Sequence, residues 1–196
     1  MNKKFVIRNI LIFIIIFIIG SIFFTNLKKS SHSDSPEQKN LSNKMILESP
    51  DFKNNEKIPI KYTGDAQNVS PSLEWHHVPK DTKSFALIVK DIDAPLKIWT
   101  HWVIFNIPSN KRKLHENIEK KTILADGAIQ GINDFGNIGY NGPYPPPGKP
   151  HRYVFTLYAL NTKLNISSKN ITRKILEKAM KNNILAQAKL TGIYER

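Results

Sequence analysis

The stretch LIVKDIDAPLKIWTHWVIFNIP, residues 87–108, decides the fold that the sequence predicts. It begins with the apolar run LIV at 87–89 and ends with the run VIFNI at 103–107, and both are rich in β-branched residues. Runs of this kind are typical of buried strands. Pro95 lies between them, and a proline has no N–H to donate to a central β-ladder. The stretch therefore predicts two buried strands joined by a turn.

Four polar or aromatic side chains gather where these two strands meet the turn. Asp91 and Asp93 are two residues apart, so in an extended chain both carboxylates point to the same side. Trp99 and His101 have the same spacing at the start of the second strand. Polar groups that are collected at the rim of a sheet form a site more often than they hold a fold together. We therefore interpret this rim as part of a site.

The composition limits the classes to which the chain can belong. Its 196 residues suffice for one ordinary domain and a targeting segment. The absence of cysteine excludes disulfides, thiolate metal sites and a cysteine nucleophile. The formal net charge is +13, and +8 remains without the five basic residues that flank the N-terminal apolar run. Because the other basic residues are scattered and the sequence has no nucleic-acid-binding motif, we expect no nucleic-acid partner.

Residues 1–29 have the pattern of a signal peptide or a signal anchor. Three basic residues precede an apolar run at 10–24. No pair of small residues marks a cleavage point, and the wider stretch 5–27 is long enough to span a bilayer. We therefore expect an inner-membrane anchor that leaves the domain in the periplasm or outside the cell. The alternative is cleavage of this leader to give a secreted or periplasmic protein.

The rest of the chain divides into a linker and one domain. Residues 30–44 are polar and rich in serine and asparagine, which predicts a flexible linker. The domain is expected over 45–196, mainly as strands, with one amphipathic helix at 171–183 whose apolar stripe includes Ile175. The stretch 184–190 fits either a helix or a strand. Further strands are expected from Met45 and over residues 58–62, 73–75, 84–90, 151–160 and 191–194.

A second set of polar side chains follows the long loop 127–148, GAIQGINDFGNIGYNGPYPPPG. A loop of this length within a compact domain is usually functional or disordered, and its prolines suit a preformed pocket wall. Residues 151–160 then alternate as a strand does, which places His151 and Tyr153 on the same side. A second imidazole therefore enters at the start of a strand, beside a phenol.

Five motifs occur in one order over the predicted domain. They are YTGDAQNVSPSLEW (62–75), VKDIDAP (89–95), HWVIFNIP (101–108), GINDFGNIGYNGPYPPPGKPHRYVFTLYAL (131–160) and LAQAKLTGIYER (185–196). With these motifs the chain resembles the phosphatidylethanolamine-binding protein family, in its bacterial Raf-kinase-inhibitor-like branch. The resemblance implies a mainly β fold of packed antiparallel sheets with a few peripheral helices. It also implies a cis peptide bond before Pro95.

The resemblance further implies a small preformed pocket for phosphate, acetate-like anions or the phosphoethanolamine head group. Carried over position by position, the residues of this ligand-binding pocket are Asp91, Asp93, Trp99, His101, Gly142, Pro143, His151 and Tyr153. The family is not known for metal-dependent catalysis. The resemblance therefore implies a binding site rather than a metal centre.

Two imidazoles suit an anion, because each ring can donate an N–H and a protonated ring donates two. Two carboxylates do not suit an anion, and three explanations are open. The aspartates orient the histidines, or one stays protonated beside the other, or they receive the ammonium group of ethanolamine. We prefer the orienting role for Asp91. The role of Asp93 stays open, and it includes fixing the turn before Pro95.

Catalysis and metal binding are the weaker interpretations of the same residues. An aspartate beside a histidine forms the base-and-orienter half of a hydrolase triad, but no serine lies in a Gly-x-Ser-x-Gly elbow. Two aspartates and two histidines can also hold a divalent cation. The pair His76-His77 lacks a further ligand at a diagnostic spacing. We therefore expect no enzyme, no metal and no cofactor.

The sequence favours a binding module that is exported or tethered to the membrane through residues 1–29. Its expected ligand is a phosphate-bearing head group or a similar small anion. The alternative is an interaction protein, an inhibitor of a protease or a kinase that uses the rim of the pocket. A hydrolase of small molecules is the least favoured of the three.

Overall fold

The computed structural model describes residues 44–166 and 170–196. The predicted membrane segment 1–29, and the predicted linker 30–44 apart from Lys44, lie outside the described residues. Within the part of the chain that the structure describes, no helix is long and apolar enough to cross a membrane.

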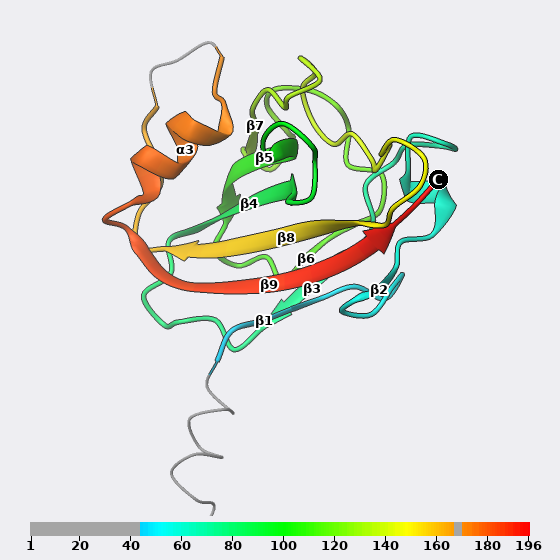
Figure 1. Ribbon diagram of the computed structural model, residues 1–196. Coiled ribbons are helices and arrows are strands. Elements are labelled where there is room, and N and C mark those ends of the chain that lie inside the picture. Colours follow the sequence, from blue (N-terminus) through cyan, green and yellow to red (C-terminus); the bar gives the residue numbers. More distant parts are fainter. Residues whose placement is uncertain (1–43, 167–169) are drawn as a thin grey trace, which may run out of the picture. The chain divides into compact units, whose positions relative to one another are not determined.

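A six-stranded sheet is the main element of the described domain (Figure 1). Its three long central strands match the apolar runs in the sequence, and all their pairings are antiparallel. They are β5 (Trp99–Pro108), β4 (Ser84–Asp91) and β8 (His151–Leu160). Outside β8 follow β9 (Ile184–Tyr194) and the short β2 (Glu56–Lys57), and outside β5 follows β7 (Ile129–Gln130). The three central strands are thus confirmed.

A smaller sheet packs against one face of this large sheet. It has three strands in the order β1 (Ile46–Glu48), β3 (Leu73–His76) and β6 (Lys113–Leu114). The main apolar core lies between the sheets, where Trp75 of β3 meets Phe85 of β4 edge-on with ring centroids 5.3 Å apart. Both side chains are fully buried. Removing this apolar surface from water is what holds the two sheets together.

The helix α3 (Arg173–Met180) covers the opposite face of the large sheet (Figure 1). Leu176 and Met180 are buried there in a second apolar cluster with Ile88 of β4. The helix is shorter than the predicted range 171–183, because the chain already turns after Met180. Ile175 was expected on the apolar stripe but is 37% exposed. The apolar contact of the helix with the sheet is therefore made chiefly by Leu176 and Met180.

Two other elements differ from those predicted. Residues 58–62 were expected as a strand, but they contain the 3-10 helix η1 (Ile60–Tyr62). Pro59 precedes it with a φ of −57°, and a proline with this φ is preorganised for the start of a helix. The strand lies earlier, at β2, and runs parallel to β9, so the large sheet is not wholly antiparallel. Residues 184–190, which fitted either a helix or a strand, form a strand, because β9 pairs with β8 along its length.

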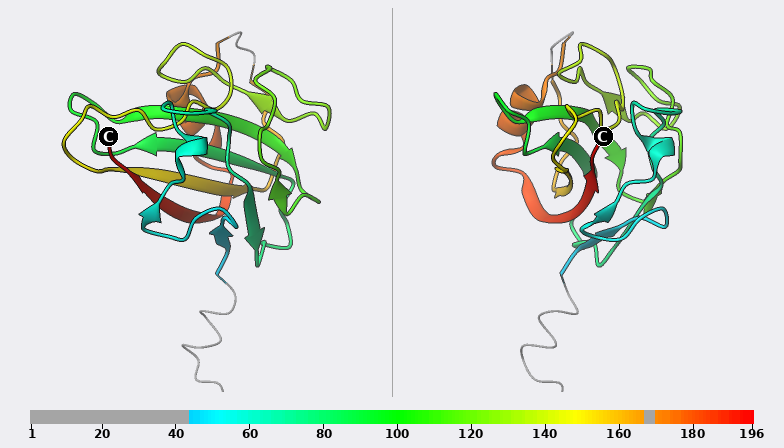
Figure 2. Two further views of the ribbon diagram at one scale, coloured as in Figure 1. Left: turned by 90° about the vertical axis from the view of Figure 1, so that its right-hand side faces the viewer. Right: turned by 45° about the vertical axis from the view of Figure 1, so that its right-hand side comes forward.

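The pairing of the central strands brings the predicted site residues to one end of the large sheet. Asp91, the last residue of β4, pairs with Trp99 at the start of β5 and with Tyr153 near the start of β8. Figure 2 shows the β4–β5 connection and the loop before β8 projecting together at this end. Chain segments about sixty residues apart therefore meet there.

Candidate functional site

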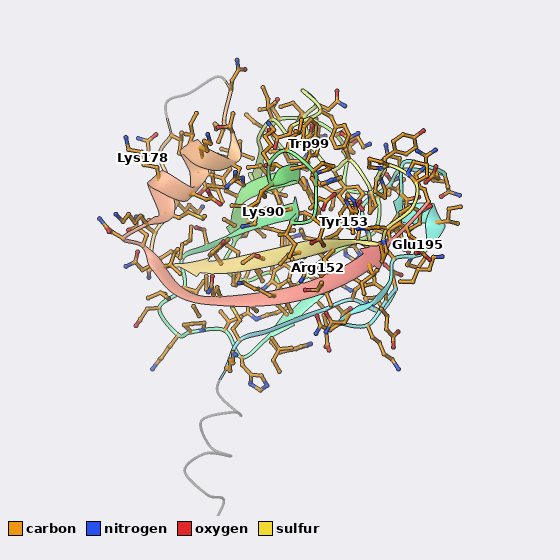
Figure 3. The ribbon with its side chains drawn as sticks, in the orientation of Figure 1. Lys90, Trp99, Arg152, Tyr153, Lys178 and Glu195 are labelled. Carbon is orange, nitrogen blue, oxygen red and sulfur yellow. The ribbon has the colours of Figure 1, made fainter. Side chains whose placement is uncertain are left out.

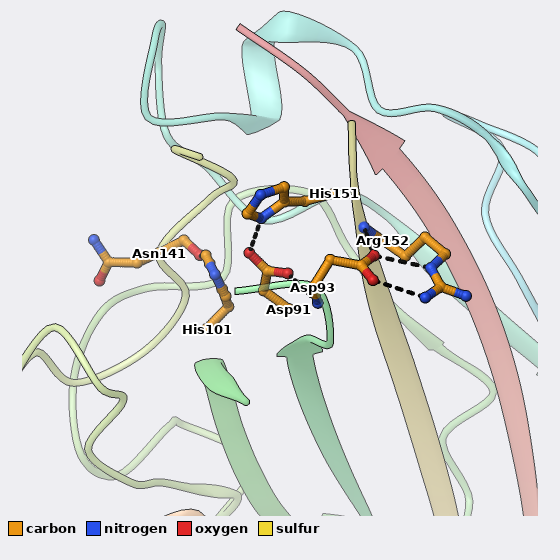
Figure 4. Close-up of polar contacts among 6 residues, drawn as sticks. All are labelled: Asp91, Asp93, His101, Asn141, His151 and Arg152. Atoms are coloured by element: carbon orange, nitrogen blue, oxygen red, sulfur yellow. Dashed lines mark hydrogen bonds and ion pairs between the residues drawn. The ribbon is translucent and has the colours of Figure 1, made fainter. Parts of the chain in front are cut away.

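The structure brings Asp91 and His151 into direct contact (Figure 4). Nδ1 of His151 donates to Oδ2 of Asp91 at 2.7 Å, and the two residues are only 7% and 4% exposed. The other carboxylate oxygen, Oδ1, accepts the backbone N–H of Asp93 at 2.9 Å. With Nδ1 engaged as a donor, Nε2 of His151 is the ring atom left for a ligand. It accepts a hydrogen bond when the ring is neutral and donates one when the ring is protonated.

His101 is held in a different way, by the backbone. Its Nδ1 donates to the carbonyl of Asn141 at 2.7 Å, and the residue is 2% exposed. Burial lowers the pKa of His101 below its ordinary value, and this effect outweighs the carbonyl of Asn141 and the charge of Asp91, which act in the opposite direction. His101 is therefore neutral at neutral pH, and its Nε2 carries a lone pair.

Tyr153 completes the inner part of the site. Its ring meets that of His101 at 90°, with the centroids 5.1 Å apart, and the residue is 1% exposed. Burial, together with the negative charge of Asp91, raises the pKa of Tyr153. The phenol therefore keeps its proton and adds a neutral hydroxyl to the site rather than a second anion.

The carboxylate of Asp93 does not lie on the same side as that of Asp91, although the sequence predicted that it would. Its carboxylate accepts the Nε and Nη2 groups of Arg152, at 2.8 Å and 2.7 Å, and also the backbone N–H of Arg152 at 2.8 Å. His151 and Arg152 are neighbours in β8 and therefore lie on opposite faces of the sheet. The expectation that both carboxylates share one side is wrong, because β4 ends at Asp91 and Asp93 already belongs to the turn. The pair with Arg152 also lowers the pKa of Asp93.

The loop that carries Gly142 and Pro143 is fixed against residues 62–68. The N–H of Gly142 donates to Oδ1 of Asn68 at 2.7 Å, and the carbonyl of Pro143 accepts the N–H of Gly64 at 2.8 Å. A Cβ on Gly142 would lie 2.2 Å from the carbonyl oxygen of Tyr62, so only glycine fits here. These contacts hold the chain at residue 141, whose carbonyl accepts from His101.

Trp99 lies at the outer side of the site, at the start of β5 (Figure 3). Its ring packs edge-on against Phe135 at 5.5 Å, and Phe135 also meets His101 at 5.2 Å. Trp99 and His101 thus share a side, as their spacing predicted. The buried Nε1 of Trp99 has no hydrogen-bond partner among the described residues.

Several residues of the site were not found from the sequence. Asn141 positions His101, and its side-chain oxygen in turn accepts Nδ2 of Asn133 at 2.8 Å. Asn68 and Phe135 also contact the site. All four lie in irregular segments, where no periodicity shows which side chain points inward. The only signal in the sequence was their position inside the long loop and the first motif.

One further expectation is contradicted by the backbone. The described residues contain no cis peptide bond, so the Ala94–Pro95 bond is trans and the implied cis bond is wrong. In the same residues, no three His, Cys, Asp or Glu side chains are placed to hold one metal ion. His76 makes an exposed contact with Glu48 at 2.9 Å instead.

The fold and the site together define a class of protein: two packed β-sheets with a buried, oriented pair of imidazoles at one sheet end. Comparison with known proteins leads to the same class. A family model described as phosphatidylethanolamine-binding protein matches residues 48–195. The chain belongs to this family, as the sequence motifs indicated.

Relatives and solved structures agree over the same part of the chain. A UPF0098 protein of Methanothermobacter thermautotrophicus is 49% identical over 78% of this chain and 99% of its own length. The crystal structure of CT736, a phosphatidylethanolamine-binding protein homologue of Chlamydia trachomatis, is 36% identical, with a TM-score of 0.71 over 79% of this chain and 99% of that one. YbcL of Escherichia coli, described as a member of the mammalian PEBP family, is 35% identical with a TM-score of 0.72. It covers 78% of this chain and 99% of its own. Chains that consist almost entirely of this domain therefore fold without a further one.

Proposed function

We propose that the chain is a binding module for a phosphate-bearing head group or a similar small anion. The observation that carries the proposal is the arrangement of the two imidazoles. Each has its Nδ1 engaged by the protein, His151 by Asp91 and His101 by the carbonyl of Asn141. Each ring is therefore fixed in orientation and has Nε2 left to meet an oxygen of a ligand. Fixed rings of this kind lose little conformational entropy on binding.

The protonation of the two rings decides how such an oxygen is held. The carboxylate of Asp91 accepts from Nδ1 of His151 at 2.7 Å, so Nε2 of His151 is left for the ligand oxygen. The buried His101 is neutral without a ligand. A phosphate group therefore binds with proton uptake by His101, or it donates its own P–O–H proton to the lone pair on Nε2. In both cases binding is favoured as the pH falls.

The two aspartates are engaged within the protein, which argues for recognition of the phosphate rather than of the ammonium group. Asp93 is bound by Arg152, and both oxygens of Asp91 already accept hydrogen bonds. An ethanolamine ammonium group would have to share these oxygens with the groups that already donate to them. We therefore assign the orienting role to Asp91 and a turn-fixing role to Asp93.

The location of the domain is part of the proposal and rests on the sequence. The pattern of residues 1–29 supports a membrane anchor with the domain outside the cytoplasm, or a cleaved leader. Cell fractionation with N-terminal sequencing distinguishes the two. A mature protein that begins near residue 30 and is found in the soluble fraction supports cleavage.

NMR spectroscopy of the imidazole groups tests ligand binding. Inorganic phosphate and phosphoethanolamine are expected to shift the signals of His101 and His151, whereas ethanolamine alone is expected to leave them unchanged. His115, outside the site, is the internal reference. If both phosphate ligands leave His101 and His151 unmoved, the proposed function is wrong.

A further inference from the structure

The β4–β5 connection carries apolar side chains that face water. Leu96 is 98% exposed, and Ile92 and Ile98 on either side of it are 37% and 42% exposed. Phe135, from the long loop, is 40% exposed. We call these four residues the apolar rim. Single exposed apolar residues are common on proteins, but a group beside a binding site marks an interaction surface.

The apolar rim is continuous with the candidate site. Phe135 contacts the rings of both Trp99 and His101. Leu96 lies on the connection between Asp93 and Trp99, and this connection projects at the end of the large sheet (Figure 2). A partner that covers the apolar rim would therefore lie beside the candidate site, where Phe135 contacts His101.

The charges around the apolar rim favour a neutral or anionic partner. Each nearby carboxylate is paired with a base, Asp93 with Arg152 at 2.7 Å and Asp134 with Lys97 at 3.4 Å. Lys149 is exposed and has no ion-pair partner among the described residues. Without the five basic residues that flank the N-terminal apolar run, the chain still has a net charge of +8. With these pairs neutralised, Lys149 leaves one positive charge two residues before His151, and a positive charge there attracts anionic lipids.

We propose that the apolar rim docks this end of the domain on a phospholipid bilayer, with Leu96 entering the acyl region. The proposal rests on the proposed function, because it names a membrane lipid as the source of the phosphate head group. A bilayer fits better than a protein, because one protruding leucine enters a fluid layer directly. A specific protein interface needs a broad matching area of about 800 Å² on each partner.

The residues beside Leu96 suit a position at the boundary between the head groups and the acyl chains of a bilayer. Lys97 lies over the ring of Trp99, with its Nζ 4.9 Å from the ring centroid. A lysine can place its charged end among the phosphates while its stem lies along apolar groups. A tryptophan is the aromatic side chain that membrane interfaces favour. Leu96, Lys97 and Trp99 thus supply an apolar, a cationic and an interfacial group within one short connection.

Vesicle flotation with the domain 42–196 tests the proposal without the predicted anchor. This part is one compact unit, and relatives of the same extent fold alone. The vesicles contain phosphatidylethanolamine and phosphatidylglycerol. Leu96→Asp is expected to weaken binding by about tenfold or more, the ratio for keeping one large aliphatic side chain in water. The matched control is Leu185→Asp, since Leu185 is also exposed but lies in the part of β9 that pairs with the far end of β8.

The outcomes separate this proposal from the proposed function. Loss of vesicle binding in Leu96→Asp, with unchanged melting temperature and unchanged binding of soluble phosphoethanolamine, supports docking through the apolar rim. Equal binding by Leu96→Asp and the parent domain overturns it. If the parent domain binds soluble phosphoethanolamine but no vesicles, docking on a bilayer is overturned and the proposed function stands. The same conclusion holds if such a domain binds a protein through Leu96. Absence of phosphoethanolamine binding in the parent domain refutes the proposed function itself.

A second variant reports insertion directly. Leu96→Trp places an indole at the tip of the connection, and brominated acyl chains quench indoles that enter the bilayer. The added tryptophan increases the fluorescence emission over that of the parent domain. We expect brominated vesicles to quench this added emission. Emission that is unchanged by brominated vesicles to which the variant is bound would place Leu96 outside the acyl region and overturn the proposal.

Discussion

The two imidazoles of the site differ in what holds them. At the start of β8, His151 donates to a buried carboxylate, that of Asp91. At the start of β5, His101 donates to a backbone carbonyl, that of Asn141. A carboxylate offsets the charge of a protonated ring, whereas a carbonyl offsets it only in part, so the buried His101 stays neutral. Two similar residues at similar places therefore have different partners, one anionic and one neutral.

The two histidines therefore have different roles in the proposed site. His151 has an anionic partner, Asp91, that is already in place in the fold. His101 is the ring whose protonation is coupled to ligand binding. If the two histidines respond alike to substitution, the difference between their partners has no consequence for the site.

The largest effect is expected from His151→Ala, because it leaves the carboxylate of Asp91 buried without its partner. Removing one member of a buried pair costs about 3 kcal/mol or more in the free energy of unfolding. Urea unfolding at neutral pH measures this loss. The double variant Asp91→Ala/His151→Ala is expected to recover part of it, since neither buried group is then left alone. A double variant whose loss equals the sum of the two single losses would show that the pair is not coupled.

His101→Ala is expected to act on binding more than on stability. Its partner is a carbonyl, and leaving a neutral acceptor unpaired costs less than leaving a buried charge unpaired. Loss of a hydrogen bond to a charged ligand should weaken the binding of inorganic phosphate by about tenfold or more. Isothermal titration calorimetry measures the affinity, and urea unfolding provides the control. If His101→Ala is destabilised as strongly as His151→Ala, the contrast between the two rings is lost.

The pH dependence of stability sharpens the same contrast. The pKa of folded His101 is lowered, so below about pH 6.5 the unfolded chain takes up a proton that the folded chain does not. Without a ligand, His101 therefore lowers the free energy of unfolding as the pH falls from 6.5 toward its folded pKa, by at most about 1.4 kcal/mol per pH unit. Urea unfolding at a series of pH values measures this slope. The slope is expected to decrease in His101→Gln.

The effect of added phosphate on the free energy of unfolding is measured at the same series of pH values. Because phosphate binds either with a proton on His101 or with its own P–O–H proton, it should stabilise the domain more at acidic than at neutral pH. A sulfate control at equal ionic strength separates specific binding from a general salt effect. Equal stabilisation by phosphate at both pH values would contradict both ways of holding the phosphate at Nε2 of His101.

The sequence predicted the strands of the site better than the contacts within it. The runs 87–89 and 103–107 are apolar on both faces, and only a central strand buries both, so β4 and β5 could be identified locally. The starts of β5 and β8 followed from alternation. Residues 58–62 have a similar apolar content, but Pro59 begins a 3-10 turn there, and the apolar pattern alone does not show this.

The partners of the site residues depend on how distant segments pack. Asn141 and Phe135 lie in a loop without periodicity, so the sequence does not show that they meet His101. The direction of Asp93 was also missed, because it depends on the residue at which β4 ends. The motifs of the family identified the positions of the pocket, but the hydrogen-bond partners that set the protonation came only from the structure.

Asp93→Asn is expected to have the smallest effect, and it tests whether the second aspartate belongs to the binding site. Asp93 is paired with the exposed Arg152, and exposed pairs of this kind contribute little to stability. Because its folded pKa is lowered, its contribution is present above the unfolded pKa and is lost as the pH falls through the folded value. The affinity for phosphate should stay within about twofold, well below the effect of one lost charged hydrogen bond. A tenfold change on calorimetric titration would instead place Asp93 among the groups that the ligand meets, and it would reopen recognition of the ammonium group.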